Sequence, residues 1–233
     1  TYTVLNGCSG VVQDIDDTIV VTDGAPVLVC KDVTVVLDGG GNATITESDV
    51  IDNLTPGTGY TIDQTGTYAP VDMSSGTTSF TLGDDDNGAA SLGFNFPFFG
   101  NTFTSVNVSS NGYLSFSGSS LNEFNNDVLP DVDTPQNVIA VVWDDLNPTL
   151  GGTIHYKVVG SSPNRVMVIE YLDVSHFGNA SLVVNAQAHI YEGSGLIEIH
   201  TDQVDSDGVG RTQGIENEDG TVAYTPAGRN GGD

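Results

Sequence analysis

The stretch "SVNVSSNGYLSF", residues 105–116, decides the fold class, because apolar and polar residues alternate in it with the period of a half-buried strand. The Asn111-Gly112 pair near its centre is typical of a hairpin turn. A two-residue turn at this pair would point the apolar side chains before and after it to opposite faces of the sheet. Burial of the apolar side chains therefore has to decide the length of the loop.

A three-residue loop ending at Gly112 resolves this conflict. It pairs Val108 with Leu114 and Val106 with Phe116, so that all four apolar side chains lie on one face. The glycine would supply the left-handed residue that a type I turn followed by a bulge requires. We predict this loop, in a hairpin that acts as scaffold within the core of a β-sandwich.

The rest of the chain has the same character. Short runs of β-branched residues recur between Gly, Asn, Asp and Pro, and almost no segment has a helical period. We expect an all-β protein with a small Ig-like β module over residues 1–57 and an antiparallel β-sandwich over residues 60–228. The predicted strands are 18–21, 26–38 and 42–46 in the first part, and 138–143, 153–159, 165–172, 182–191 and 196–200 in the second.

Two of these segments also predict how their residues are buried and paired. The run "VIAVVW" at 138–143 is apolar at every position, which indicates a central strand buried on both faces. The segment 182–200 predicts a hairpin whose apolar residues share one face and in which His189 lies opposite Glu198. We interpret these two residues as a cross-strand pair on an exposed face.

The charge balance excludes some classes of partner. Five Lys and Arg stand against 31 Asp and Glu, and the formal net charge is −26. We expect no nucleic-acid partner, because no basic stripe could neutralise phosphates. An anionic membrane surface would repel the chain unless divalent cations bridged the two, and no apolar run is long enough for membrane insertion.

Cys8 and Cys30 are the only cysteines. In a chain rich in Asp, Thr and Gly they indicate an extracellular or cell-surface location and a disulfide between them, although two separate buried thiols are the alternative. Closing that loop would stabilise the fold by roughly 3 kcal/mol in the chain-entropy model. The first residues have no signal-peptide pattern, as expected of the mature part of a secreted protein.

Two resemblances to known families support this view. "APVLVCKDVTVVLDGGGNATIT", residues 25–46, resembles the start of the HYR-like, Ig-like repeats of large surface proteins of Bacteroidetes-type bacteria. The chain then departs from that pattern, because "DNLTPGTGY" leads directly into the next segment without a further cysteine.

The larger part resembles the nidogen-like (NIDO-like) β-sandwich domains of bacterial extracellular proteins. The residues that carry this resemblance are "LGFNFPFFGNTFTSVNVSSNGYLSF" (92–116), "NVIAVVWDDLNP" (137–148), "GGTIHYKV" (151–158), "NRVMVIEYLDVSHF" (164–177), "HIYEGSGLIEIH" (189–200) and "GIENEDGT" (214–221). The resemblance implies a sandwich fold and an extracellular setting in adhesins, matrix proteins or accessory regions of hydrolases. It brings no set of catalytic residues.

Acidic loops are the candidate binding sites. They are "QDIDDT" (13–18), "GDDDNG" (83–88), "NNDVLPDVD" (125–133), "WDDLNP" (143–148) and "VDSDGVG" (204–210). Carboxylates so close repel one another unless water or a cation intervenes, and Ca²⁺ prefers six to eight oxygen ligands. We predict Ca²⁺ as cofactor, with ligands among Asp84, Asp86, Asp127, Asp131, Asp133, Asp144, Asp145, Asp205 and Asp207. None of the loops has EF-hand spacing, so a solvated turn is the alternative for each.

No motif predicts catalysis. The sequence has no HExxH, GxSxG or phosphate-binding loop, and its four histidines are scattered without metal-ligand spacing. Asp144 and Asp145 could be mistaken for a glycosidase pair, but neighbours on one strand point to opposite faces. We therefore expect that the chain is not an enzyme.

Two functions remain. The first is an extracellular structural or adhesion module, stabilised by Ca²⁺, in a surface adhesin or self-assembling filament whose copies or modules join through strand edges. The alternative is a glycan-binding accessory module of a secreted hydrolase, with exposed aromatic side chains beside an acidic groove.

Overall fold

The structure is a computed structural model that describes residues 17–23, 27–30, 51–55, 59–118 and 122–232. Every regular element in these ranges is a strand, and all strand pairs are antiparallel. The predicted all-β class is therefore confirmed. Within the same ranges no helix is long and apolar enough to cross a membrane.

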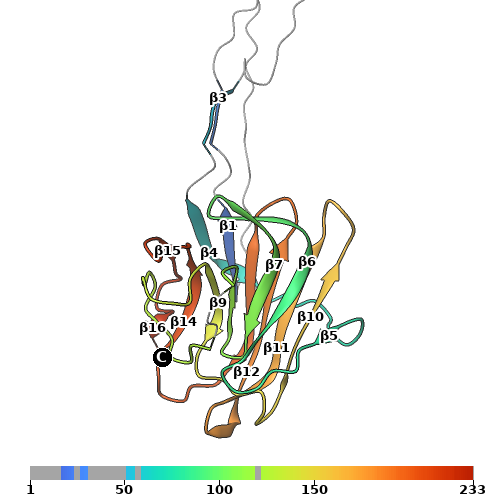
Figure 1. Ribbon diagram of the computed structural model, residues 1–233, viewed down its shortest axis with the longest axis vertical. Coiled ribbons are helices and arrows are strands. Elements are labelled where there is room, and N and C mark those ends of the chain that lie inside the picture. Colours follow the sequence, from blue (N-terminus) through green and yellow to red (C-terminus); the bar gives the residue numbers. More distant parts are fainter. Residues whose placement is uncertain (1–16, 24–26, 31–50, 56–58, 119–121, 233) are drawn as a thin grey trace, which may run out of the picture.

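Two sheets face each other in a sandwich (Figure 1). The first has the order β4 (Tyr60–Thr67), β1 (Asp17–Asp23), β13 (Ile197–Val204), β12 (Asn179–Tyr191), β11 (Val166–His176), β10 (Thr153–Val159) and β5 (Thr78–Ser79). The second has the order β15 (Ala223–Tyr224), β14 (Arg211–Glu216), β9 (Val138–Trp143), β8 (Tyr113–Ser115), β7 (Asn101–Ser109) and β6 (Asn87–Phe98), with β16 (Asn230–Gly232) also paired to β14.

The N-terminal part contributes to the larger sheet. β1 comes from the predicted N-terminal module, yet it pairs with both β4 and β13. β2 (Val27–Cys30) and β3 (Ile51–Thr55) form a two-stranded sheet. Apart from β2, the HYR-like stretch lies outside the described residues, and so does Cys8. The disulfide and the boundary between the two predicted modules stay predictions.

The hairpin of β7 and β8 has the predicted three-residue loop. Val108 pairs with Leu114, and Gly112 has a φ of 75°. Val106, Val108, Leu114 and Phe116 all belong to the main hydrophobic core. Burial therefore selects the register in which the apolar side chains share one face.

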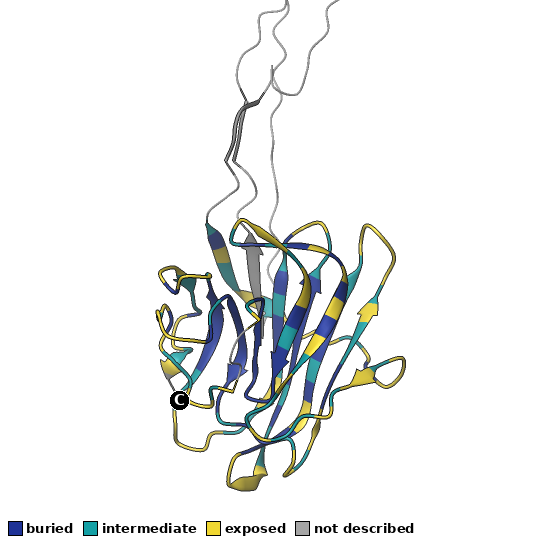
Figure 2. Ribbon diagram, in the orientation of Figure 1, coloured by how far each residue is buried: buried dark blue, intermediate teal, exposed yellow. Residues whose placement is uncertain are grey.

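Two cores explain why β9 is apolar throughout. The main core fills the space between the sheets, where Ile139 and Val141 of β9 contribute. A smaller core of Tyr113, Leu129, Val138, Ala140 and Trp143 lies on the other face of β9. All six residues of β9 are buried, as predicted, and Figure 2 shows the dark blue strands at the centre of the molecule.

The β12–β13 hairpin has the predicted register but not the predicted exposure. His189 lies opposite Glu198, as expected. The face is not exposed, however, because His189 has only 1% of its surface accessible. The segment around Val71 covers this face, where its backbone N–H and C=O both hydrogen-bond to Gln187 at 2.9 Å. The interpretation of an exposed pair was wrong because the covering segment lies 116 residues away in the chain.

Candidate functional site

Acidic loops gather at one end of the sandwich. Four segments meet there: the turn before β6, the loop after β9, the end of β11 and the loop between β13 and β14. Backbone hydrogen bonds link two of them, since Phe177 donates its N–H to the Asp145 carbonyl at 2.8 Å and Asn147 donates to Ser175 at 2.7 Å. Asp84, Asp85, Asp144, Asp145, His176 and Asp207 all lie at this end, which we call the acidic end.

The first group at the acidic end consists of carboxylates alone. One oxygen from each of Asp84, Asp85 and Asp145 lies within 4.8 Å of the others. We call these three residues the carboxylate cluster. Burial raises the pKa of Asp145 to about 6, and the charges of Asp85 and Asp84 add to the effect. Burial, together with the charge of Asp85, also raises the pKa of Asp84. Bringing these charges together costs free energy that a bound cation would offset.

The second group contains a histidine. Asp144, His176 and Asp207 place one ligand atom each within 4.8 Å of the others, and we call them the aspartate–histidine cluster. His176 is fully buried and Asp144 is 2% exposed, while Asp207 is exposed. Burial is the main cause that raises the pKa of Asp144. This cluster therefore combines two buried polar groups with one side chain that reaches solvent.

Asn111 of the β7–β8 turn holds two of these loops in place. Its Nδ2 donates to Oδ1 of Asp85 at 2.9 Å and to the Glu123 carbonyl at 3.2 Å. Its Oδ1 accepts the backbone N–H of Leu146 at 3.0 Å. The hairpin that sequence analysis assigns to scaffold thus also positions the candidate site.

The structure brings together four of the nine predicted metal ligands. Asp84 meets Asp145, and Asp144 meets Asp207. The remaining five, Asp86, Asp127, Asp131, Asp133 and Asp205, belong to none of the three ligand groups found among the described residues.

Several of these five carboxylates hold their own loops instead. Oδ2 of Asp86 accepts the N–H of Gly83 at 2.9 Å, and Oδ2 of Asp205 accepts that of Val183 at 2.9 Å. Oδ1 of Asp131 accepts the N–H of Asp133 at 2.8 Å. The contacts of Asp86 and Asp131 are the local turn contacts that aspartate favours, so the solvated-turn alternative describes them. Asp205 instead bonds to a residue of the neighbouring strand β12.

Sequence reasoning missed Asp85 and His176. Asp85 stands inside the "GDDDNG" stretch, where it has a positive φ of 47° and contacts Asn111. No local pattern predicts His176. The pairing of Leu146 with His176 and the neighbouring backbone hydrogen bonds bring the end of β11 beside the loop after β9.

A third group of possible ligands, His189, Glu198 and His200, lies on the covered face of the first sheet. Oε2 of Glu198 accepts the Tyr191 hydroxyl at 2.5 Å and lies 3.2 Å from Nε2 of His200. Although burial opposes the change, hydrogen bonds from these partners and from His189 hold the pKa of Glu198 well below its usual range. Hydrogen bonds already connect the group, so we interpret it as a structural network.

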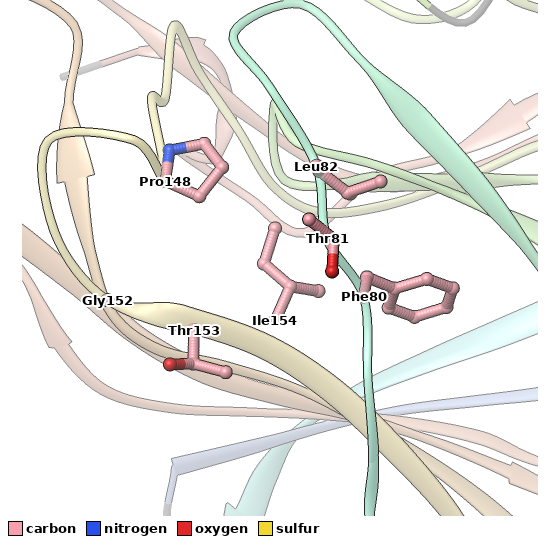
Figure 3. A pocket seen from close by; sticks show the side chains of 7 residues that line it. All are labelled: Phe80, Thr81, Leu82, Pro148, Gly152, Thr153 and Ile154. Atoms are coloured by element: carbon pink, nitrogen blue, oxygen red, sulfur yellow. The ribbon is translucent and has the colours of Figure 1, made fainter.

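A shallow pocket of about 210 Å³ lies beside the loops of the acidic end (Figure 3). Its walls are Phe80, Thr81, Leu82, Pro148, Gly152, Thr153 and Ile154. None of these side chains ionises, so the pocket has neither an acid–base pair nor a metal ligand of its own.

The two facing sheets, with acidic loops at one end, define an antiparallel β-sandwich module. A family model described as "NIDO related" matches residues 59–231, and the chain therefore belongs to the NIDO-related family. Searches among curated proteins and among solved structures found no match. The resemblance to NIDO-like domains is thus confirmed, and a NIDO-related domain fits an extracellular module.

Proposed function

We propose that this chain is a non-enzymatic structural module of an extracellular surface protein, used in adhesion or assembly, whose acidic end binds Ca²⁺. The observation that carries the proposal is the convergence of Asp84 and Asp85 with Asp145, from loops about sixty residues apart in the chain. Ligands on opposite sides of one Ca²⁺ lie about 4.8 Å apart, since Ca–O distances are about 2.4 Å. One oxygen of each of the three carboxylates can therefore reach a single Ca²⁺, which supports the proposal.

A role in stability follows from the charge. The chain carries a net charge of −26, and Ca²⁺ at the carboxylate cluster would reduce the repulsion at its acidic end. At a free concentration of one hundred times Kd, a bound ion stabilises the folded state by about 2.7 kcal/mol. For a domain of this size that corresponds to about 5–10 °C in Tm.

Thermal unfolding in Ca²⁺ and in EDTA tests this proposal. We expect Ca²⁺ to raise the Tm of the unmodified chain by several degrees, and the double variant Asp84→Asn/Asp145→Asn to lose most of this response. Asp202→Asn is the matched control, because it removes one exposed carboxylate outside the acidic end. Equal melting of the unmodified chain in Ca²⁺ and EDTA would contradict the proposal.

Assembly through strand edges completes the proposal. The first sheet ends in β4 and β5, and the second ends in β15 and β6. An edge strand offers backbone groups to which a strand from a neighbouring copy or module can add. Size-exclusion chromatography with and without chelator tests whether copies of the chain assemble. Species larger than a monomer in Ca²⁺ would support assembly, and a monomer whose elution does not change with chelator would count against it.

Glycan binding is the second candidate function, favoured by one side chain. Phe177 directly follows His176 and is 56% exposed, although its backbone is fixed by the bond to Asp145. An aromatic ring held beside acidic groups can stack on a sugar ring. A glycan array in millimolar Ca²⁺, comparing the unmodified chain with Phe177→Ala, tests this role. An array without any positive glycan would remove its support.

A further inference from the structure

The aspartate–histidine cluster contains buried atoms that have no hydrogen-bond partner. Both ring nitrogens of His176 are buried and have no hydrogen-bond partner, and the same is true of Oδ2 of Asp144. The other oxygen of Asp144 is occupied, since Oδ1 accepts the Asp145 N–H at 2.8 Å. Leaving buried polar atoms unpaired is costly, so their convergence on one point requires an explanation.

The distances in this cluster fit ligands around a shared ion better than hydrogen bonds. Nδ1 of His176 lies 3.6 Å from Oδ2 of Asp144 and 3.8 Å from Oδ2 of Asp207. Hydrogen bonds between such groups are about 2.7–3.2 Å long. Ligand atoms of a tetrahedral metal site, with bonds of about 2.1 Å, lie about 3.4 Å from one another. Nδ1 of His176 therefore lies from each of the two carboxylate oxygens at almost the distance that a shared metal would impose.

We propose that Asp144, His176 and Asp207 bind a first-row transition-metal dication of the Zn²⁺ class. The ligands are Nδ1 of His176 and one carboxylate oxygen from each aspartate. Imidazole nitrogen is a ligand that Zn²⁺ favours, whereas Ca²⁺ takes oxygen ligands. The inference goes beyond the proposed function, because it concerns another cluster and another class of metal.

The surrounding charges favour a cation here. Two carboxylates and a neutral imidazole give the cluster a charge of −2, which matches a dication. Asp145 lies beside it, and Asp205 precedes Asp207 in the same loop. The charge of Arg211 also acts on Asp144, but its guanidinium donates to the carbonyls of Val204 and Asp205. Negative charge therefore outweighs positive charge around the site.

Access and an open coordination position come from Asp207. Its side chain is 23% exposed, whereas those of His176 and Asp144 are 0% and 3% exposed. An ion can thus enter from the side of Asp207, and water can complete its coordination there. Three protein ligands plus water is the arrangement of an open zinc site, but no nucleophile or general base has been identified beside it, so we assign it a structural role.

The test is isothermal titration calorimetry, in which the full chain is titrated with Zn²⁺ in the presence of 1 mM Ca²⁺. We expect each chain to bind one Zn²⁺ ion, and we expect Ca²⁺ not to displace it. Asp207→Asn should weaken binding at least about tenfold, since loss of even an outer-shell partner has an effect of that size. Asp207 is the residue of choice because its side chain, at 23% exposure, is the most accessible of the three, so its variant carries the smallest risk of misfolding.

Two comparisons assign the ion to this cluster. Asp84→Asn should leave Zn²⁺ binding unchanged, because it removes a carboxylate only from the carboxylate cluster. Co²⁺ should give visible absorption bands of a site with nitrogen and oxygen ligands, which Asp207→Asn and His176→Asn should abolish. Cys8 and Cys30 are other possible Zn²⁺ ligands, and the variants exclude them as the source of the signal.

The outcomes separate this inference from the proposed function. Absence of saturable Zn²⁺ binding, displacement of Zn²⁺ by Ca²⁺, or unchanged affinity in Asp207→Asn would each overturn the transition-metal site. The Ca²⁺ proposal would survive these results if Ca²⁺ still raised Tm through Asp84 and Asp145. Conversely, specific Zn²⁺ binding without any effect of Ca²⁺ on Tm would leave this inference standing and remove the other.

Discussion

Glu216 shows what a single buried carboxyl does to this fold. It lies on β14 with no accessible surface, and its Oε2 accepts the Asp131 N–H at 2.6 Å. Its Oε1 has no hydrogen-bond partner. Burial is the main cause that raises the pKa of Glu216 to about 7, and the charges of Asp131 and Asp127 contribute to this rise. The charged form of this side chain therefore destabilises the folded state above neutral pH.

Replacing this carboxyl by a neutral amide should stabilise the chain in alkaline solution. Because the folded-state pKa is raised, the protonated form stabilises at acidic pH, and that stability is lost as the pH rises through about 7. Glu216→Gln should therefore raise the free energy of unfolding by about 1–2 kcal/mol at pH 8 and change it little at pH 5. Urea unfolding at both pH values measures this.

The exposed Glu218→Gln serves as control, since it should have no effect of this kind at either pH. A Glu216→Gln variant with the same change in free energy at pH 5 and pH 8 would show that the carboxyl is not the cause.

At the scale of an element, the β7–β8 turn depends on one glycine. A Cβ built on Gly112 would lie 1.8 Å from the Val142 carbonyl oxygen, and the φ of 75° is unfavourable for other residues. Gly100 also has a positive φ, 81°, but no atom lies within 4 Å of its Cβ position. Gly112 and Gly100 thus share a backbone conformation that strains other residues, but only Gly112 is packed too closely to accept a Cβ.

Gly112→Ala should destabilise the fold by about 3 kcal/mol or more, because the turn must move away from β9. Gly100→Ala should cost only about 1 kcal/mol, the strain of a left-handed residue. Chemical unfolding of both variants, with failure of Gly112→Ala to fold counted as the larger effect, measures the difference. Equal losses in the two variants would show that contact with Val142 does not restrict the turn.

The same turn shows what the sequence can and cannot predict. Its register follows from alternation, because a slip of one residue would expose an entire apolar face. The contact of Asn111 with Asp85 does not follow, because the two residues are 26 positions apart and meet only after the sheets have packed. Local patterns predicted β9 to β13, the pairing of His189 with Glu198 and four of the carboxylates that gather at the acidic end. The convergence of those ligands with His176, and the cover over His189, depend on tertiary contacts.

At the scale of the whole molecule, the raised pKa values add up to one dependence on pH. Burial raises the pKa of Asp145 to about 6 and that of Glu216 to about 7, and also raises that of Asp127. Between about pH 5 and 7 the folded chain therefore binds more protons than the unfolded chain, and stability falls as the pH rises. His189 acts in the opposite direction, because burial lowers its pKa, but it is one group against several. Glu198, whose folded-state pKa is lowered, also acts in the opposite direction, and the stability that it contributes is lost as the pH falls below about 5.

Cations should change this profile. In EDTA we expect Tm to fall by several degrees between pH 5 and pH 7.5. In 5 mM Ca²⁺ the fall should be much smaller, because the ion replaces the proton at the carboxylate cluster and its binding strengthens as Asp145 ionises. Differential scanning calorimetry across this range measures both profiles, and NaCl at the same ionic strength controls for general screening. Parallel profiles in EDTA and Ca²⁺ would mean that the acidic end tolerates its charges without a bound ion.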